Sequence, residues 1–170
     1  MKGTEKNHRI YVGIGSNIEP LKHIKKCVQS LKEEFTNLKL SPIYESSSMG
    51  FTGPNFYNLA ASFDTMYDYN SLKVFLNHVE SSNGRSLGEV KFSSRTLDID
   101  ILYYDDLIDM DKNIPRGEIT KFDFVLRPLY DLQPGHRHPV IMKTHYTMIN
   151  DMRLQKMIIR QIDTSLLEWI

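Results

Sequence analysis

The spacing of apolar residues in the first part of the chain predicts a strand, a helix and a second strand. Residues 9–14 are rich in β-formers and end at Gly15-Ser16-Asn17, which is typical of a buried strand. Apolar side chains recur at nearly helical spacing from residue 20 to residue 35, so this segment predicts a helix. Residues 38–44 favour a second strand.

The middle of the chain repeats this alternation after a loop. Residues 46–54 are rich in Ser, Gly and Pro and predict that loop. Residues 55–64 favour a strand, and residues 69–80 carry apolar side chains on one helical face. A polar segment punctuated by glycines, residues 81–94, predicts a second loop before a strand at Asp98–Tyr104.

The resulting order, β-α-β-β-α-β, predicts an α+β protein with a ferredoxin-like fold. In this fold two helices cover one face of an antiparallel sheet. The part from about Lys112 onward predicts C-terminal additions: loops, a strand at residues 123–126, and a helix near residues 143–153. We expect residues 1–170 to form a single domain, because 170 residues is an ordinary size for one.

Composition narrows the classes of function. The chain has 21 Lys and Arg residues and 21 Asp and Glu residues, so its formal net charge is zero. A nucleic-acid or membrane-surface binder usually carries a basic excess, so we expect neither partner. The single cysteine, Cys27, excludes an internal disulfide and is predicted to be an ordinary helix residue. The polar N-terminus has the pattern of neither a signal peptide nor a membrane span, and we expect a cytoplasmic protein.

The strongest local signal for chemistry is the sequence RTLDIDIL at residues 95–102. Side chains at i and i+2 of a strand point to the same face, so Asp98 and Asp100 present two carboxylates side by side, about 7 Å apart at Cα. Mg²⁺ suits such a pair, because it is a hard cation held by one or two carboxylates together with substrate phosphates. The alternative is a solvated strand face that carries two unrelated acids.

Cations precede this acidic pair. Arg85, Lys91 and Arg95 lie within eleven residues, in a segment that Gly84 and Gly88 loosen. A basic loop beside a divalent metal suits a polyphosphate, whereas the competing interpretation is a solvated charged loop. The glycine-containing residues 13–17 lack the spacing of a phosphate loop, so side chains and metal must hold any nucleotide.

Aromatic and amide side chains indicate a place for a flat ligand. Phe56 and Asn58 share a strand face, and Phe124 lies in the later predicted strand. Two rings and an amide suit a flat heterocycle, although on the residues alone both phenylalanines fit a plain core better. His136 and His138 have a His-x-His spacing that suits a metal, but we favour a turn with surface histidines because no third ligand is suggested nearby.

Together these segments resemble the 6-hydroxymethyl-7,8-dihydropterin pyrophosphokinases of folate biosynthesis. The resemblance runs from about Ile10 to Pro139 and includes YVGIGSNI, IYESSSMGFTGPNFYNLA, VESSNGR, SSRTLDIDIL and FVLRPLYDLQP. The R-x-x-D-x-D stretch is the most specific of the family's motifs. The resemblance implies a ferredoxin-like fold, ATP and two Mg²⁺ ions, and transfer of pyrophosphate from ATP to the hydroxymethyl group of the pterin with release of AMP.

The resemblance also implies roles for individual residues. Asp98 and Asp100 would bind both metal ions, and together with Arg85 and Arg95 they would form the catalytic set. The implied ATP-binding residues are Glu80, Arg85, Lys91, Arg95, Ile101, Arg116 and Lys121. The implied pterin-binding residues are Ser46, Ser47, Met49, Phe56, Asn58 and Phe124.

Several positions depart from the family pattern. Arg116 stands where a His that touches ATP is usual, and Phe122 stands where an Arg is usual, with Lys121 beside it. Replacements in the loop before the acidic pair are Leu87 for Arg, Phe92 for Trp, and Ser93-Ser94 for Gly-Pro. In this interpretation Arg116 and Lys121 restore the phosphate contacts from shifted positions. The alternatives to an active enzyme are a pterin- or nucleotide-binding relative with weakened catalysis and a metal-responsive regulatory domain.

Overall fold

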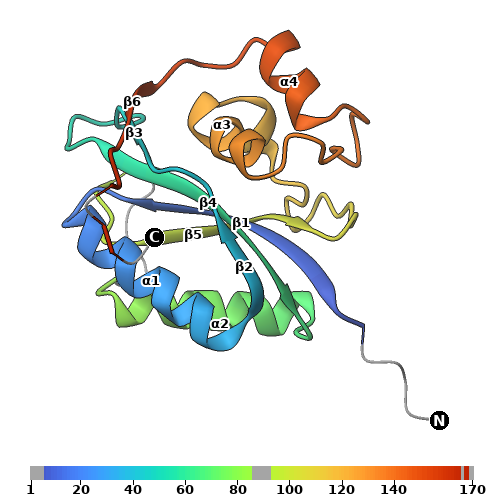
Figure 1. The fold of residues 1–170 in the computed structure, drawn as a ribbon, viewed down its shortest axis with the longest axis horizontal. Helices are drawn as coiled ribbons and strands as arrows, with labels where there is room; N and C mark the ends of the chain where they lie inside the picture. The colour runs from blue at the N-terminus through green and yellow to red at the C-terminus, as the bar shows by residue number, and fades with distance from the viewer. Residues whose placement is uncertain (1–5, 86–92, 166, 169–170) are drawn as a thin grey trace.

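Among the described residues, a six-stranded antiparallel sheet forms the centre of the protein. The computed structural model describes residues 6–85, 93–165 and 167–168. The strands are β1 (His8–Ser16), β2 (Thr36–Leu40), β3 (Tyr44–Ser46), β4 (Phe56–Thr65), β5 (Asp98–Tyr104) and β6 (Ile158–Gln161). The helices are α1 (Pro20–Glu34), α2 (Tyr69–Ser82), α3 (Asp123–Leu132) and α4 (His145–Asp151), with a 3₁₀ turn η1 (Gly117–Thr120). The strands lie in the order β5-β1-β4-β3-β6, and β2 pairs with the other half of β4 (Figure 1).

The register of β1 positions the later site, because β1 lies between β4 and β5. Gly15 pairs with Asn58 on β4 and with Asp98 on β5. Gly13 pairs in the same way with Asp100 on β5. Paired residues direct their side chains to the same face of a sheet. The amide and both carboxylates therefore share one face, and the glycines between them leave that face open.

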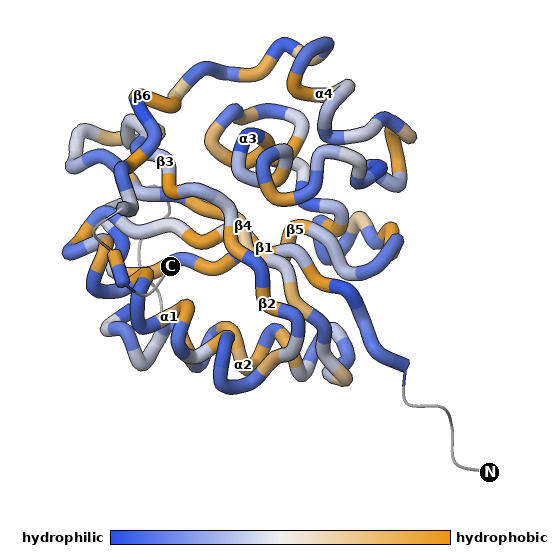
Figure 2. Tube along the Cα trace, in the orientation of Figure 1, coloured by the Kyte–Doolittle hydropathy of each residue, from blue (hydrophilic) through white to orange (hydrophobic). Residues whose placement is uncertain are grey.

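Helices α1 and α2 cover the opposite face of the sheet (Figure 1). Ile10, Val12 and Ile14 of β1 point into the core between these layers. Apolar and polar positions alternate along both helices (Figure 2), and the buried apolar stripe of α1 comprises Ile24, Cys27, Val28 and Leu31. Two predictions are confirmed: both helices lie on one face of an antiparallel sheet, and Cys27 is a helix residue. The structure adds that Cys27 is buried.

Helices α3 and α4 add a third layer on the face that carries the acidic pair (Figure 1). Tyr11, Leu102 and Tyr103 of the sheet share a second core with Leu126 and Leu129 of α3. The molecule is therefore an α+β fold, compatible with the predicted ferredoxin-like order, and the C-terminal additions cover its second face. None of the helices in the described part of the chain is long and apolar enough to cross a membrane.

The predicted strand at residues 123–126 is wrong, because these residues begin helix α3. The short run Asp-Phe-Val-Leu fits either a strand or a helix, and tertiary packing selects the helix. Leu126 and Leu129, three residues apart, both contribute to the second core. The buried Asp123 carboxylate accepts hydrogen bonds from the backbone N–H groups of Met157 and Ile158, which anchors the start of the helix to the C-terminal segment.

The single strand predicted at residues 38–44 is also wrong, because the segment forms two strands, β2 and β3. Pro42 lies between them and has no backbone N–H to donate to a neighbouring strand. The hydroxyl of Ser41 instead accepts a hydrogen bond of 2.8 Å from the backbone N–H of Ala60 on β4. The break lets β2 and β3 pair with different halves of β4.

Candidate active site

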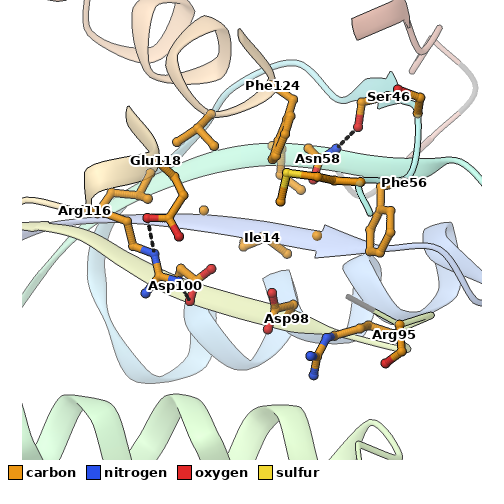
Figure 3. Close-up of a pocket in the computed structure, with 18 of the residues that line it drawn as sticks. Ile14, Ser46, Phe56, Asn58, Arg95, Asp98, Asp100, Arg116, Glu118 and Phe124 are labelled. Atoms are coloured by element: carbon orange, nitrogen blue, oxygen red, sulfur yellow. Dashed lines mark hydrogen bonds and ion pairs between the residues drawn. The ribbon is translucent and has the colours of Figure 1, made fainter. Parts of the chain in front are cut away.

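A cavity of about 310 Å³ opens on the sheet face that carries α3. Strands β1, β4 and β5 form its floor, and α3, the loop after β3 and the segment around Arg116 form its sides (Figure 3). A cleft of this size suits a small ligand. The predicted site residues that line it are Ser46, Ser47, Met49, Phe56, Asn58, Arg85, Arg95, Asp98, Asp100, Arg116 and Phe124.

The acidic pair lies at one end of this cavity, on β5 (Figure 3). The alternation predicted for this strand is confirmed, because Ile99 and Ile101 are buried on the other face while the side chains of Asp98 and Asp100 are 35% and 32% exposed. Burial raises the pKa of the Asp100 carboxyl, the charge of Asp98 adds to the rise, and Arg116 opposes it. A cation between the two carboxylates would relieve this repulsion.

Each carboxylate of the pair already has an arginine beside it. Arg85 Nη1 lies 2.7 Å from Asp98 Oδ1, and Arg116 Nη2 lies 3.1 Å from Asp100 Oδ1. Each guanidinium also contacts a second carboxylate: Arg85 Nη1 lies 2.5 Å from Glu80, and Arg116 Nε lies 3.3 Å from Glu118. Both arginines therefore link the acidic pair to acids elsewhere in the fold.

Glu80 supports the site from beneath it. Its buried carboxylate accepts a hydrogen bond of 2.7 Å from the backbone N–H of Ile99 and pairs with Arg85, so it joins α2 to β5. Burial raises the pKa of Glu80, while the Ile99 hydrogen bond and Arg85 oppose that rise. Glu80 does not line the cavity, and its contacts are those of a residue that holds Arg85 in place.

The other end of the cavity is aromatic and carries one amide. Phe56 of β4 and Phe124 of α3 are half-buried and line the cavity instead of filling a core. Asn58 is 9% exposed, and its Nδ2 donates a hydrogen bond of 2.7 Å to the Ser46 hydroxyl (Figure 3). A Cβ atom on Gly15 would lie 3.1 Å from Asn58 Oδ1, so glycine keeps that oxygen accessible.

Two other predicted residues, Ile101 and Lys121, lie elsewhere. Ile101 is 2% exposed in the core beside α1 and α2, and Lys121 is an exposed residue at the end of η1; neither lines the cavity. Lys91, Leu87 and Phe92 lie outside the described residues. Phe124 was expected on a strand but reaches the cavity from a helix.

Some cavity residues were not singled out from the sequence. Glu118 lies two residues after Arg116 and pairs with it, a relation that only the η1 turn reveals. Gly13 and Gly15 form part of the floor. Their signal was the Gly-Ile-Gly motif, which is not a phosphate loop but leaves room for a ligand above β1.

The expectation of surface histidines at the 136–138 turn is wrong. His138 is 4% exposed, and the His136 ring lies 4.6 Å from the Tyr103 ring beneath α3 and α4. Among the described residues, no group of three or more His, Cys, Asp or Glu side chains is arranged to hold a metal ion. The acidic pair alone would therefore need ligands from a substrate to complete a coordination shell.

Comparison with known proteins shows the family to which the chain is related. The family model for 7,8-dihydro-6-hydroxymethylpterin-pyrophosphokinase matches residues 11–134. The pyrophosphokinase of Aquifex aeolicus (strain VF5) is 33% identical over 138 residues, which cover 79% of this chain and 86% of the relative. The corresponding enzyme of Helicobacter pylori is 33% identical over 130 residues, covering 72% of this chain and 80% of the relative.

The fold agrees as well. A crystal structure of a Plasmodium falciparum HPPK-DHPS triple mutant superposes with a TM-score of 0.70 at 14% identity, over 88% of this chain and 45% of that longer chain. At this identity the likeness concerns the fold alone. Because the family model matches residues 11–134, which are most of this chain, the chain belongs to the 7,8-dihydro-6-hydroxymethylpterin-pyrophosphokinase family.

Proposed function

We propose that residues 1–170 act as one pyrophosphokinase domain whose reaction takes place in the cavity above β1. As a member of its family, the chain is an ATP-dependent pyrophosphokinase of folate biosynthesis that uses Mg²⁺ and 6-hydroxymethyl-7,8-dihydropterin. One observation supports this location above others: a single cavity joins the carboxylates of Asp98 and Asp100 to an aromatic, amide-bearing end.

The aromatic end is proposed to hold the pterin. Phe56 and Phe124 offer ring faces for a flat heterocycle. The Asn58 amide is fixed by its donation to Ser46, which leaves Oδ1 as an acceptor for an N–H group of the pterin ring. Ser47 and Met49, from the loop after β3, would close the side of this end. The alcohol of the bound pterin would then point along the cavity toward β5.

The acidic end fits the metal that the family uses. Asp98 and Asp100 present hard oxygen ligands on one strand face. Burial and the neighbouring charge of Asp98 raise the pKa of Asp100, and a cation between the two carboxylates would relieve their repulsion. We propose that they hold two Mg²⁺ ions, which would supply charge neutralisation to the triphosphate of ATP. Phosphate oxygens would complete the coordination that the protein leaves open.

The arginines are proposed to exchange partners when ATP binds. Arg85 and Arg116 neutralise the carboxylates in the free protein, and the phosphates of ATP would take over their guanidinium groups once cations reach the acids. Arg95 would add positive charge on the same side. Glu80 and Glu118 would keep Arg85 and Arg116 within reach during this exchange.

The reaction then requires the protein mainly to align the two substrates, and no protein side chain needs to form a bond with either of them. The pterin alcohol oxygen forms a bond to the β-phosphorus of ATP, and the bond from that phosphorus to the α–β bridging oxygen breaks. AMP leaves with the bridging oxygen, and the alcohol proton passes to solvent or phosphate. Holding both substrates in one cavity makes this attack effectively unimolecular. No covalent intermediate with the protein is needed.

The test is an assay for AMP from ATP, Mg²⁺ and 6-hydroxymethyl-7,8-dihydropterin. Wild type should form AMP and pterin diphosphate in equal amounts. Asp98→Asn and Asp100→Asn should each lower turnover by about 100-fold or more, because each removes a carboxylate proposed to hold the Mg²⁺ ions that neutralise the phosphates. Their circular dichroism spectra should match wild type, since both side chains are partly exposed.

Three outcomes would contradict the proposal. Formation of ADP in place of AMP would mean transfer of a different group. Binding of both substrates without turnover would leave a relative with weakened catalysis. Full activity in both asparagine variants would move the metal site away from β5.

A further inference from the structure

A second cleft, of about 700 Å³, lies against another side of α3. Asp123, Arg127 and Tyr130 line it, and their spacing of four and three residues places them on one face of the helix. Phe124 and Val125, on a different side of α3, line the active cavity instead. No described residue lines both spaces, so α3 separates the second cleft from the active cavity.

The wall opposite α3 is the segment 152–158, which returns from α4 to β6 (Figure 1). Its backbone is tied to the start of α3. The N–H of Asp123 donates to the Gln155 carbonyl at 3.2 Å, and the N–H of Gln155 donates to the Lys121 carbonyl at 2.8 Å. Helix α4 and Tyr44 of β3 complete the lining. A volume of this size with walls fixed by hydrogen bonds suits a small molecule.

Arg127 is held in this cleft in a defined orientation. Asp131 accepts hydrogen bonds from its Nε at 3.1 and 3.2 Å, and the Tyr44 hydroxyl donates to the same carboxylate at 2.5 Å. The guanidinium carbon Cζ lies 5.4 Å from the centre of the Tyr130 ring and 5.9 Å from the centre of the Tyr44 ring. Because Asp131 engages Nε, the Nη groups remain as donors for a ligand.

The charge of the lining favours an anion. Lys156 adds a second cation to that of Arg127. Among the described residues, the one carboxylate that lines the cleft is that of Asp123. It is buried and already accepts hydrogen bonds from the backbone N–H groups of Met157 and Ile158. A carboxylate is the anion that matches the planar fork of a guanidinium.

The rest of the lining is aromatic and apolar. The Tyr130 and Tyr146 rings lie 6.3 Å apart at an angle of 34°. Ile149, Met152 and Leu154 also line the cleft, and all three pack against the second core. Aromatic and aliphatic walls of this kind suit the faces of a flat ring.

We propose that this cleft is a second ligand site, which takes a small flat aromatic carboxylate with its carboxylate on Arg127 and its ring beside Tyr130 and Tyr146. The ligand would lie outside the cavity in which the reaction takes place. This inference goes beyond the proposed function and does not depend on it, because it uses none of the residues assigned to ATP, metal or pterin.

Calorimetry with two probes of the same shape tests the site. Naphthalene-2-carboxylate carries the charge, and naphthalene-2-carboxamide is its neutral counterpart. Wild type should bind the carboxylate about tenfold more tightly than the amide, because a hydrogen bond to a charged group is stronger than one to a neutral group. Arg127→Gln should bring the two dissociation constants together. Arg160→Gln should keep the preference, since Arg160 is an exposed arginine that pairs with Glu45 and does not line the cleft.

A further variant and a competition experiment locate the probe. Tyr146→Ala should weaken both probes by about the same factor, because it removes a ring face and no charge. In wild type, saturating Mg²⁺, 6-hydroxymethylpterin and α,β-methylene ATP, which resists the cleavage proposed above, should change the carboxylate's dissociation constant by no more than about twofold, as expected for separate sites.

Four results would overturn the inference: no binding of the carboxylate up to about 1 mM, equal affinity for both probes in wild type, an unchanged preference in Arg127→Gln, or displacement of the probe by the substrates. Displacement would place the probe in the active cavity. If Arg127→Gln does not fold, unchanged binding of both probes in Tyr146→Ala would overturn it. Probe binding is measured without turnover, so failure of the site leaves the pyrophosphokinase proposal intact, and absence of AMP formation leaves the site intact.

Discussion

Arg116 lies between two carboxylates, Asp100 and Glu118, at the phosphate end of the cavity. The resemblance noted in the sequence leads us to expect a histidine at this position, and a histidine would change its charge near neutral pH. Arginine keeps a fixed positive charge and a two-pronged donor. The substitution therefore leaves the cavity with a cation that is independent of pH, and Glu118 accepts a contact from it that the sequence did not indicate.

The role of Arg116 is tested by comparing two single variants, Arg116→Gln and Lys121→Gln. We expect Arg116→Gln to raise the dissociation constant for Mg²⁺ and ATP by about tenfold or more, because a hydrogen bond to a charged group is lost. Lys121→Gln should change it much less, since Lys121 is exposed and does not line the cavity. Titration calorimetry at low and moderate salt gives both constants, and the difference should narrow as salt screens the charge.

The reverse ranking of these two variants would assign the phosphate contact to Lys121. Unchanged affinity in both would mean that Arg116 serves only as a counter-ion for Asp100. Pterin affinity measured without nucleotide should be the same in both variants, which separates a local effect from a general one.

Helices α3 and α4 hold a cluster of histidines against the sheet. His145 of α4 is fully buried, with Nδ1 at 2.9 Å from the Gln133 carbonyl and Nε2 at 3.1 Å from the Tyr103 hydroxyl. The carbonyl requires a proton on Nδ1, so the neutral ring accepts from tyrosine. Burial lowers the pKa of His145 to about 4, and the neighbouring His136 adds to that shift. Burial lowers the pKa values of His136 and His138 as well.

These shifts predict that acid weakens this layer. The unfolded chain takes up a proton near pH 6.5, before the folded chain does, so the stability is present above that pH and is lost as the pH falls toward 4. His145→Asn keeps a donor for the Gln133 carbonyl but has no imidazole to titrate. As the pH falls from about 6.5 to about 4, we expect its free energy of unfolding to decrease by about 1–3 kcal/mol less than that of wild type.

Urea unfolding at a series of pH values measures this difference. His78→Asn, on the exposed side of α2, is the matched control and should follow wild type. Equal pH dependence in wild type and His145→Asn would show that another group governs acid stability.

At the level of the whole protein, the sheet lies between two helical layers and the cavity opens between the sheet and one of them (Figure 1). A ligand in the cavity therefore contacts β1, β4, β5, the 46–54 loop and α3 together. Such a ligand binds only the folded chain, so its binding free energy adds to stability.

Metal removal should expose this linkage. With Mg²⁺ and α,β-methylene ATP at about 100 times the dissociation constant, the stabilisation is about 2.7 kcal/mol, which raises the melting temperature of a chain of this size by about 5–10 °C. A chelator should reverse the shift in wild type. In Asp100→Asn the nucleotide should give little shift, with or without chelator. A full shift in wild type with chelator present would mean that metal is not needed to bind the nucleotide.

The sequence by itself determined what depends on local periodicity. Side chains alternate along a strand, so the R-x-x-D-x-D motif was enough to place Asp98 and Asp100 on one face and Ile99 on the other. The order of strands and helices through β5 followed from the same kind of pattern, except that the one strand predicted at residues 38–44 forms two, β2 and β3. Resemblance to a family extended this to Asn58 and Phe56, which share a strand and a face.

Only the tertiary structure decided which distant segments meet. Residues 123–126 form a helix because the sheet face above β1 is apolar and needs cover, and that helix carries Phe124 to the cavity. Arg116 reaches Asp100, and Asn17 reaches Pro54 and Arg95, across long stretches of chain. Such contacts depend on how elements dock, and docking is set by the shape and burial of whole surfaces instead of by the spacing of neighbours in sequence.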